Sequence, residues 1–144
     1  MALTDAQIVI RLVLATGVGA LLGLERERHH KSAGFRTNSL IALGSCVFTL
    51  VGLLAGGGDP TRIPGQVVTG IGFLGAGAIL HNSERVQGMT TAAMIWVNAA
   101  LGCACGAGQI RLAVLGTGVT LAILLILGPL ERALEPKNGA GPTA

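Results

Sequence analysis

Hydrophobic residues form five long stretches of the chain, and charged residues occur only between them. The uncharged stretches cover residues 12–24, 37–58, 63–83, 86–110 and 112–130. An α-helix rises about 1.5 Å per residue, so ~20 apolar residues cross ~30 Å of hydrocarbon. Four stretches reach this length, and the first does so if it begins near Ile8 and Arg11 extends to the interface. The pattern predicts an all-α polytopic membrane protein, a bundle of about five transmembrane helices.

The predicted helices occupy about 8–24, 39–56, 64–80, 90–107 and 112–130, within one transmembrane domain over residues 1–135. Residues 136–144 form a short polar tail. Hydroxyl and amide side chains favour helix N-caps, so we expect Thr37, Asn38 or Ser39 to cap the second helix. Thr90 and Thr91 are expected to do the same for the fourth helix. Residues 1–7 carry no cation, which predicts a retained first helix instead of a cleaved signal peptide.

The distribution of cations over the loops predicts the orientation of the bundle. Seven Lys and Arg residues lie on the side of the first loop, the third loop and the C-terminus, whereas three lie on the opposite side. Because cytoplasmic loops carry an excess of cations, we expect the N-terminus outside and the C-terminus in the cytoplasm.

Composition narrows the class of protein further. Charged residues make up 12% of the chain, 23 residues are Gly and the net charge is only +3. Disordered chains are more polar, and the 3% of aromatic residues offers almost no surface for stacking bases, so no nucleic-acid partner is expected. The three cysteines lie in predicted helices and favour apolar packing, which leaves no expected metal or cofactor. No nucleophile and base pattern is present, so we expect no enzyme.

Small residues recur at helical spacing along the predicted helices. In lipid, helices associate through close backbone approach at such residues. The predicted packing positions are Gly19, Gly23, Gly70, Gly72, Gly75, Gly77, Asn98 and Gly102. Gly70, Gly72 and Gly75 also match the spacing of a dinucleotide-binding loop, but no strand precedes them, so helix packing is the better interpretation. Asn98 lies in the middle of its helix and needs either an interhelical hydrogen bond or a polar path.

Two polar clusters are candidates for function. Residues 25–28, Glu-Arg-Glu-Arg, follow the first helix and predict either a solvated turn with a Glu25–Arg28 pair or a docking surface. Asp59 lies beside Arg62 and Gln66 where the third helix begins. The aspartate can cap that helix or pair with Arg62, or it can gather cations at a membrane entrance. A single carboxylate holds Mg²⁺ only weakly, so it makes no metal site.

Five segments together resemble the membrane domain of the MgtC/SapB family. They are residues 23–27, 33–38, 59–63, 66–77 and 88–93, in the order in which the family has them. The resemblance implies a bacterial inner-membrane protein linked to magnesium homeostasis and virulence. It also implies a regulatory role through binding of other membrane machinery, such as the F-type ATP synthase or P-type ATPases. Some members carry a cytoplasmic ACT-like domain, and we expect only the transmembrane domain here.

The resemblance also marks a set of functional positions. By matching motifs they are Glu25, Arg26, Arg36, Thr37, Asp59, Arg62, Gln66, Thr90, Thr91 and Trp96.

Two functions are therefore expected from different classes. The first is a regulatory membrane protein that acts by helix–helix contact, with the lipid bilayer, other membrane proteins and a second copy of the chain as partners. The alternative is a transporter or channel for a cation such as Mg²⁺, or for a small solute, in which Asp59, Gln66 and Asn98 supply polar groups.

Overall fold

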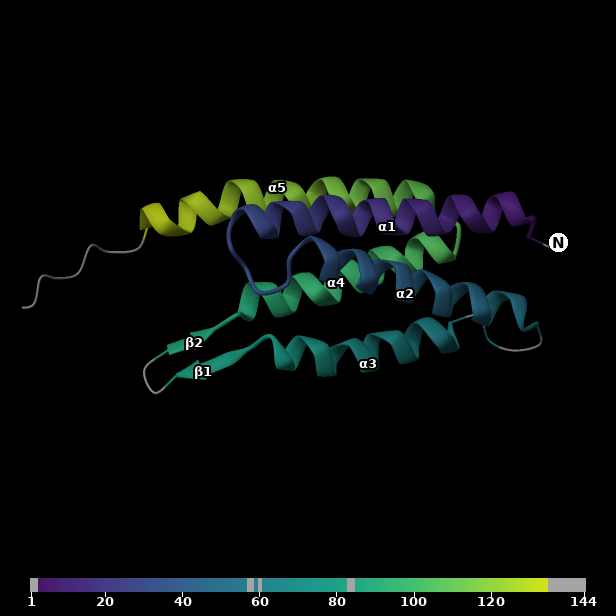
Figure 1. Cartoon of the computed structure of the whole chain (residues 1–144), viewed down its shortest axis with the longest axis horizontal. Helices are drawn as coiled ribbons and strands as arrows, with labels where there is room; N and C mark the ends of the chain where they lie inside the picture. Colours follow the sequence, from purple (N-terminus) through teal and green to yellow (C-terminus); the bar gives the residue numbers. More distant parts are fainter. Residues whose placement is uncertain (1–2, 57–58, 60, 83–84, 135–144) are drawn as a thin grey trace, which may run out of the picture.

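The computed structural model describes residues 3–56, 59, 61–82 and 85–134, and the expected polar tail at 136–144 lies outside them. Five helices and one hairpin follow each other along the chain. They are α1 (Asp5–Arg28), α2 (Phe35–Leu54), α3 (Arg62–Gly77), β1 (Leu80–Asn82), β2 (Arg85–Gln87), α4 (Met89–Gly106) and α5 (Ile110–Leu134). Figure 1 shows the helices side by side, each running along the long axis of the molecule. The all-α helical bundle that the hydrophobic pattern predicts is present.

Within the described residues, four helices are long and apolar enough to cross a membrane: α1, α2, α4 and α5. The expectation that all five helices have this length is wrong for α3, which has 16 residues. Its uncharged stretch is divided, because the chain leaves the helix after Gly77 and enters β1 at Leu80. β1 pairs with β2 in antiparallel register, with Leu80 opposite Gln87. The hydrophobic pattern did not predict this hairpin.

The helix starts differ from the predicted caps. α1 begins at Asp5, because Thr4 and Gln7 form a capping box there. Gly34 is the N-cap of α2, and the carboxylate of Glu27 accepts the Phe35 N–H at 3.0 Å. The predicted capping by Thr37, Asn38 or Ser39 is therefore wrong, because a side chain of α1 already caps α2.

The start of α4 also differs from the prediction. Gly88 is its N-cap, with a φ of +89° that a glycine adopts without strain, and no side chain caps the helix. Thr90 and Thr91 therefore lie inside α4, and the prediction that they cap it is wrong.

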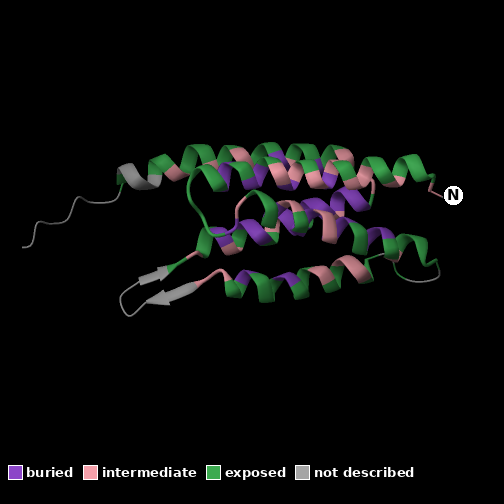
Figure 2. Cartoon of the chain, viewed as in Figure 1, coloured by how far each residue is buried: buried purple, intermediate pink, exposed green. Residues whose placement is uncertain are grey.

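The core lies where α4 packs against the other four helices, and α1 and α2 also pack closely together. Figure 2 shows buried residues concentrated on α4 and on the inner sides of its neighbours. Close approach depends on glycine at two positions in particular. A Cβ at Gly19 would lie 2.9 Å from the Ser39 Cα of α2, and one at Gly102 would lie 2.9 Å from the Ala42 Cα. The backbones of α1 and α4 therefore lie directly against that of α2.

The predicted packing glycines fall into an inner and an outer group. Gly23, like Gly19 and Gly102, has the backbone of another segment within 3.0 Å of the place that a Cβ would take. Gly75 has room, because its nearest neighbour would be the Ala92 oxygen at 3.7 Å. A Cβ at Gly70, Gly72 or Gly77 would meet nothing within 4 Å. These three glycines of α3 therefore have no close packing neighbour among the described residues.

Arg11 is anchored inside the bundle. Its Nη1 donates to the Gly106 carbonyl oxygen at 2.7 Å. This carbonyl belongs to the last turn of α4, where backbone oxygens lack partners within the helix and a cation is favourable. The guanidinium that was expected to extend to the interface thus also caps α4.

Candidate functional site

A polar cavity of about 660 Å³ opens at the end of the bundle where α1 and α5 finish and α4 begins. We call it the end chamber. Its polar wall is formed by Glu25, Arg26, His29, Lys31, Gln87, Thr90 and Thr91. Residues Ile123, Leu124 and Leu127 of α5 form an apolar wall opposite. The chamber thus joins side chains that lie as many as 102 positions apart in the chain, such as Glu25 and Leu127.

A buried ion pair forms one side of the end chamber. The Arg26 guanidinium donates to both carboxylate oxygens of Glu25, and the bond from Nη2 to Oε1 measures 2.7 Å. Glu25 is 7% exposed and Arg26 is 5% exposed. The ring Nδ1 of His29, one helical turn further on, lies 3.1 Å from Oε1 of Glu25.

The prediction of a solvated turn with a Glu25–Arg28 pair is wrong. The wall of α4 and α5 covers this face of α1, so Glu25 and Arg26 lie inside the protein and satisfy each other. A buried carboxylate or guanidinium without such a partner would be very costly.

The end chamber brings together four of the residues that the family motifs marked: Glu25, Arg26, Thr90 and Thr91. Thr91 is 4% exposed, whereas Thr90 is exposed. The motifs missed His29 and Lys31. The spacing of His29 from Glu25 was a usable signal, because residues four apart share one face of a helix.

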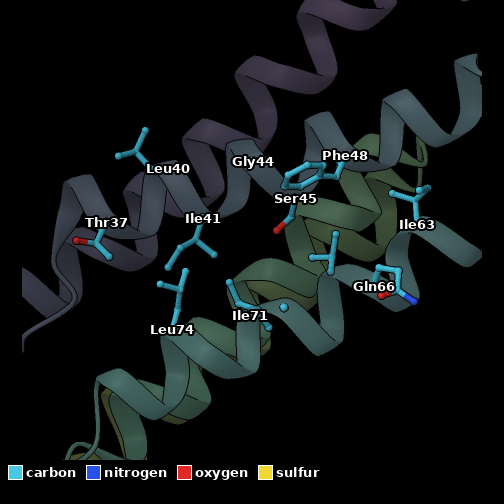
Figure 3. Close-up of a pocket in the computed structure, with 12 residues that line it drawn as sticks. Thr37, Leu40, Ile41, Gly44, Ser45, Phe48, Ile63, Gln66, Ile71 and Leu74 are labelled. Carbon is cyan, nitrogen blue, oxygen red and sulfur yellow. The ribbon is translucent and has the colours of Figure 1, made fainter.

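The α2–α3 groove is the second hollow of the bundle, with a volume of about 750 Å³. Figure 3 shows Thr37 at one end, Gln66 and Ile63 at the other, and Phe48, Ile41 and Leu74 along its apolar sides. Two motif residues, Thr37 and Gln66, therefore line a surface separate from the end chamber.

Arg36 and Trp96 lie outside both hollows. Arg36 lines another hollow, of about 660 Å³, beside the loop between α1 and α2, together with Glu27 and Phe35. Trp96 is 51% exposed on α4. The structure gives neither side chain a hydrogen-bond partner among the described residues.

Asp59 lies in the loop between α2 and α3, away from the end chamber. Its Oδ1 accepts the Thr61 hydroxyl at 2.6 Å and the Thr61 N–H at 2.9 Å. These two bonds favour the ionised carboxylate, the hydroxyl bond most, and hold the pKa of Asp59 below its ordinary value. Within the described residues Asp59 makes no ion pair with Arg62, which was one of the alternatives for this carboxylate, and contacts Thr61 instead.

Replacing Thr61 with valine should raise the pKa of Asp59 towards its ordinary value, because the bond with the larger effect is lost while the N–H bond remains. The bonded carboxylate stabilises this loop above the unfolded-state pKa, and that effect is lost as the pH falls through the folded-state pKa. A carboxyl ¹³C NMR titration measures the shift. Thr69→Val, which removes a hydroxyl inside α3 that bonds to Gly65, should leave the Asp59 titration unchanged. An unchanged midpoint in Thr61→Val would contradict this assignment.

Asn98 makes an interhelical hydrogen bond, one of the two alternatives that its position left open. Its amide donates to the Asn38 backbone oxygen at 2.7 Å and lies 3.2 Å from the Asn38 side-chain oxygen. Asn38 in turn donates to the backbone oxygens of Ala33 and Gly34. Both asparagines are fully buried between α2 and α4. This amide pair ties the start of α2 to the middle of α4.

The apolar helices, the buried amide pair and the polar end chamber define a multi-pass helical membrane protein. A profile of the MgtC family matches residues 12–133. The chain is 44% identical to Protein MgtC of Brucella abortus over 82% of its length and 50% of that protein. It is 42% identical to "Putative magnesium transporter YhiD" of Escherichia coli K12, over 92% of this chain and 66% of that protein.

A third relative, Protein MgtC of Salmonella typhimurium, is 41% identical over 83% of this chain and 52% of its own length. The chain belongs to the MgtC family. It spans about half the length of the MgtC proteins that it matches. No solved structure gives a significant match.

Proposed function

We propose that this chain is a regulatory protein of the bacterial inner membrane that acts in magnesium or ion homeostasis, or in stress adaptation such as virulence. It binds other membrane proteins through helix–helix contacts and catalyses no reaction. The excess of cations on one side supports an N-terminus outside and a C-terminus in the cytoplasm. The name of the Escherichia coli relative, a putative magnesium transporter, supports the link to magnesium.

The main support for this proposal is the face of α3 that points away from the other helices. Only Ile71 and Gly75 of α3 are buried, and Phe73 is 84% exposed. Gly65 and Gly72 lie seven residues apart on one side of the helix, and nothing in the described structure occupies the space beside either of them. Glycine weakens a helix by about 1 kcal/mol relative to alanine in water.

Contact with another helix supplies a reason for these glycines, because small residues let membrane helices approach closely. The partners that we propose are the F-type ATP synthase or P-type ATPases, as the motifs imply, and a second copy of this chain. The α2–α3 groove continues the same surface around α3.

The alternative, a cation or solute conduit, needs its polar groups along one path. Asp59 lies in a loop, Gln66 lines the α2–α3 groove and Asn98 is enclosed between α2 and α4. Their separation favours the regulatory proposal.

Replacing Gly72 with leucine should reduce association about tenfold, because the added side chain fills the space that a partner helix needs. The measurement is recovery of the F-type ATP synthase, a P-type ATPase and a second, differently tagged copy after mild cross-linking in native membranes. Gly118→Leu is the matched control, since Gly118 is equally open but lies on α5.

Recovery of all three partners that is equal in wild type and Gly72→Leu would contradict the proposal. Mg²⁺ flux into proteoliposomes that contain only this protein, lost in Asp59→Ala, would instead favour the conduit.

A further inference from the structure

We propose that the end chamber binds a phosphate oxyanion, carried either by an anionic phospholipid headgroup or by a soluble phosphate compound. This inference concerns the ligand of the chamber and does not depend on the partner proposed for α3.

The charged side chains that line the end chamber have a net positive charge. Glu25 is the one carboxylate in the described wall, and Arg26 neutralises it through two hydrogen bonds. Lys31 also lines the chamber, and none of the ion pairs of the described residues involves it. Its backbone N–H donates to the Arg26 oxygen at 3.0 Å, which fixes the point from which its side chain extends along the chamber wall. An anion is the ligand that this balance favours.

The first turn of α4 supplies N–H donors to the same chamber. α4 has 18 residues, and its N-cap Gly88 offers no side chain to the free N–H groups of the first turn. Gly88, Thr90 and Thr91 all line the chamber. The aligned peptide dipoles add partial positive charge at this end, which is the usual reason that phosphate groups bind at helix N-termini.

The Thr91 hydroxyl is an independent sign of a ligand. Six hydroxyls elsewhere in the described helices donate to the carbonyl four residues earlier, whereas those of Thr37 and of the buried Ser45 do not. Those that do are Thr16, Ser39, Thr49, Thr69, Thr117 and Thr120.

For Thr91 the residue four positions earlier is Gln87, which belongs to β2 and not to the helix. Although Thr91 is 96% buried, its hydroxyl has no hydrogen-bond partner in the part of the chain that the structure describes. Thr91 lines the chamber, so a phosphate oxygen bound there would accept a hydrogen bond from its hydroxyl.

The apolar wall of α5 suits a ligand whose anionic group is attached to an apolar or aromatic part. Ile123, Leu124 and Leu127 lie across from the cationic wall. The chamber is at the end of the bundle with the cation-rich loops, where the charge distribution predicts the cytoplasmic face. Both a phospholipid headgroup and a soluble phosphate compound can reach that position.

Two arms of one experiment separate these sources. In the first arm the full chain is held in dodecyl maltoside, which contains no phosphate, and inorganic phosphate is titrated and followed by ³¹P NMR. In the second arm the chain is placed in nanodiscs of equal parts phosphatidylglycerol and phosphatidylcholine, and native mass spectrometry counts the lipids that stay bound. Phosphate binding in the first arm assigns a soluble ligand, and retention of phosphatidylglycerol over phosphatidylcholine assigns a lipid.

Lys31→Gln and Thr91→Val test the residues that define the site. Lys31→Gln should weaken binding about tenfold and Thr91→Val about fivefold, as expected for loss of a bond to a charged group. Lys31 is exposed, so its replacement leaves the fold intact even if Thr91→Val unfolds. Arg62→Gln makes the same charge change at an exposed position outside the chamber and should leave binding within twofold.

Two results would overturn the proposal. One is the absence of both phosphate binding and phosphatidylglycerol retention in the wild-type protein. The other is an equal loss in Lys31→Gln and Arg62→Gln, which would mean that the anion responds to overall charge and not to this chamber.

Discussion

Replacing Gly102 with alanine is expected to lower the free energy of unfolding by about 3 kcal/mol, the upper end of the usual cost of overpacking a core. The added methyl group would lie 2.9 Å from the Ala42 Cα and still closer to the Ala42 carbonyl oxygen. Both are backbone atoms of α2, so no side chain can rotate away. The two helices must separate, and separation strains the hydrogen bond between Asn98 and Asn38 one turn earlier.

Reversible unfolding in mixed detergent micelles measures this loss. Gly118→Ala is the control, because a Cβ there meets nothing within 4 Å and alanine favours the helix. The control should be neutral or slightly stabilising. Equal stability of the Gly102 and Gly118 variants would show that α2 and α4 do not approach as closely as described.

Replacing Arg26 with methionine is the second change with a large expected effect, again about 3 kcal/mol. Methionine keeps much of the volume, but the Glu25 carboxylate, 7% exposed, would lose the guanidinium that binds both of its oxygens. His29 alone would remain beside it. The double variant Glu25→Met/Arg26→Met should recover most of the lost stability, because it removes both buried charges together.

The two single variants and the double variant form a double-mutant cycle, in which the double variant is compared with the sum of the single ones. Arg28→Met replaces an exposed cation two residues further on and is the control for the loss of charge and the change in helix propensity. Arg28→Met should change stability by less than about 0.5 kcal/mol. If the losses of the two single variants simply add in the double variant, Glu25 and Arg26 are not a coupled buried pair.

The hydrophobic pattern was sufficient to predict the five helices, because a long uncharged segment in lipid satisfies its backbone groups within a helix. It did not show that the third stretch leaves the helix after Gly77 and enters a hairpin. It could not predict which glycine faces a neighbour. Gly19 and Gly72 occur in similar small-residue spacings, yet a Cβ at Gly19 would run into α2 and one at Gly72 would meet nothing within 4 Å. The difference arises from how whole helices are placed against one another. The spacing of small residues along one helix carries no information about that placement.

Some residues of the end chamber could be predicted from the sequence, but not that they meet. Motif positions marked Glu25 and Thr91, but their meeting depends on the packing of α1 against α4, 66 positions apart in the chain. Local rules also misplaced the helix starts. The cap of α2 comes from Glu27, eight residues before the Phe35 N–H that it accepts, and such a contact is invisible to a search for neighbouring cap residues.

The shortness of α3 has a consequence for the bilayer itself. A helix of 16 residues is about 24 Å long, some 6 Å less than the thickness of a typical hydrocarbon core. The other four helices have the length to span it. This hydrophobic mismatch confines membrane thinning to one flank of the bundle, the flank that exposes Gly72. Membrane proteins with similarly short helices would relieve this thinning of the bilayer by associating at that flank. The bilayer thickness thus helps to select the partner, in addition to the surface of α3.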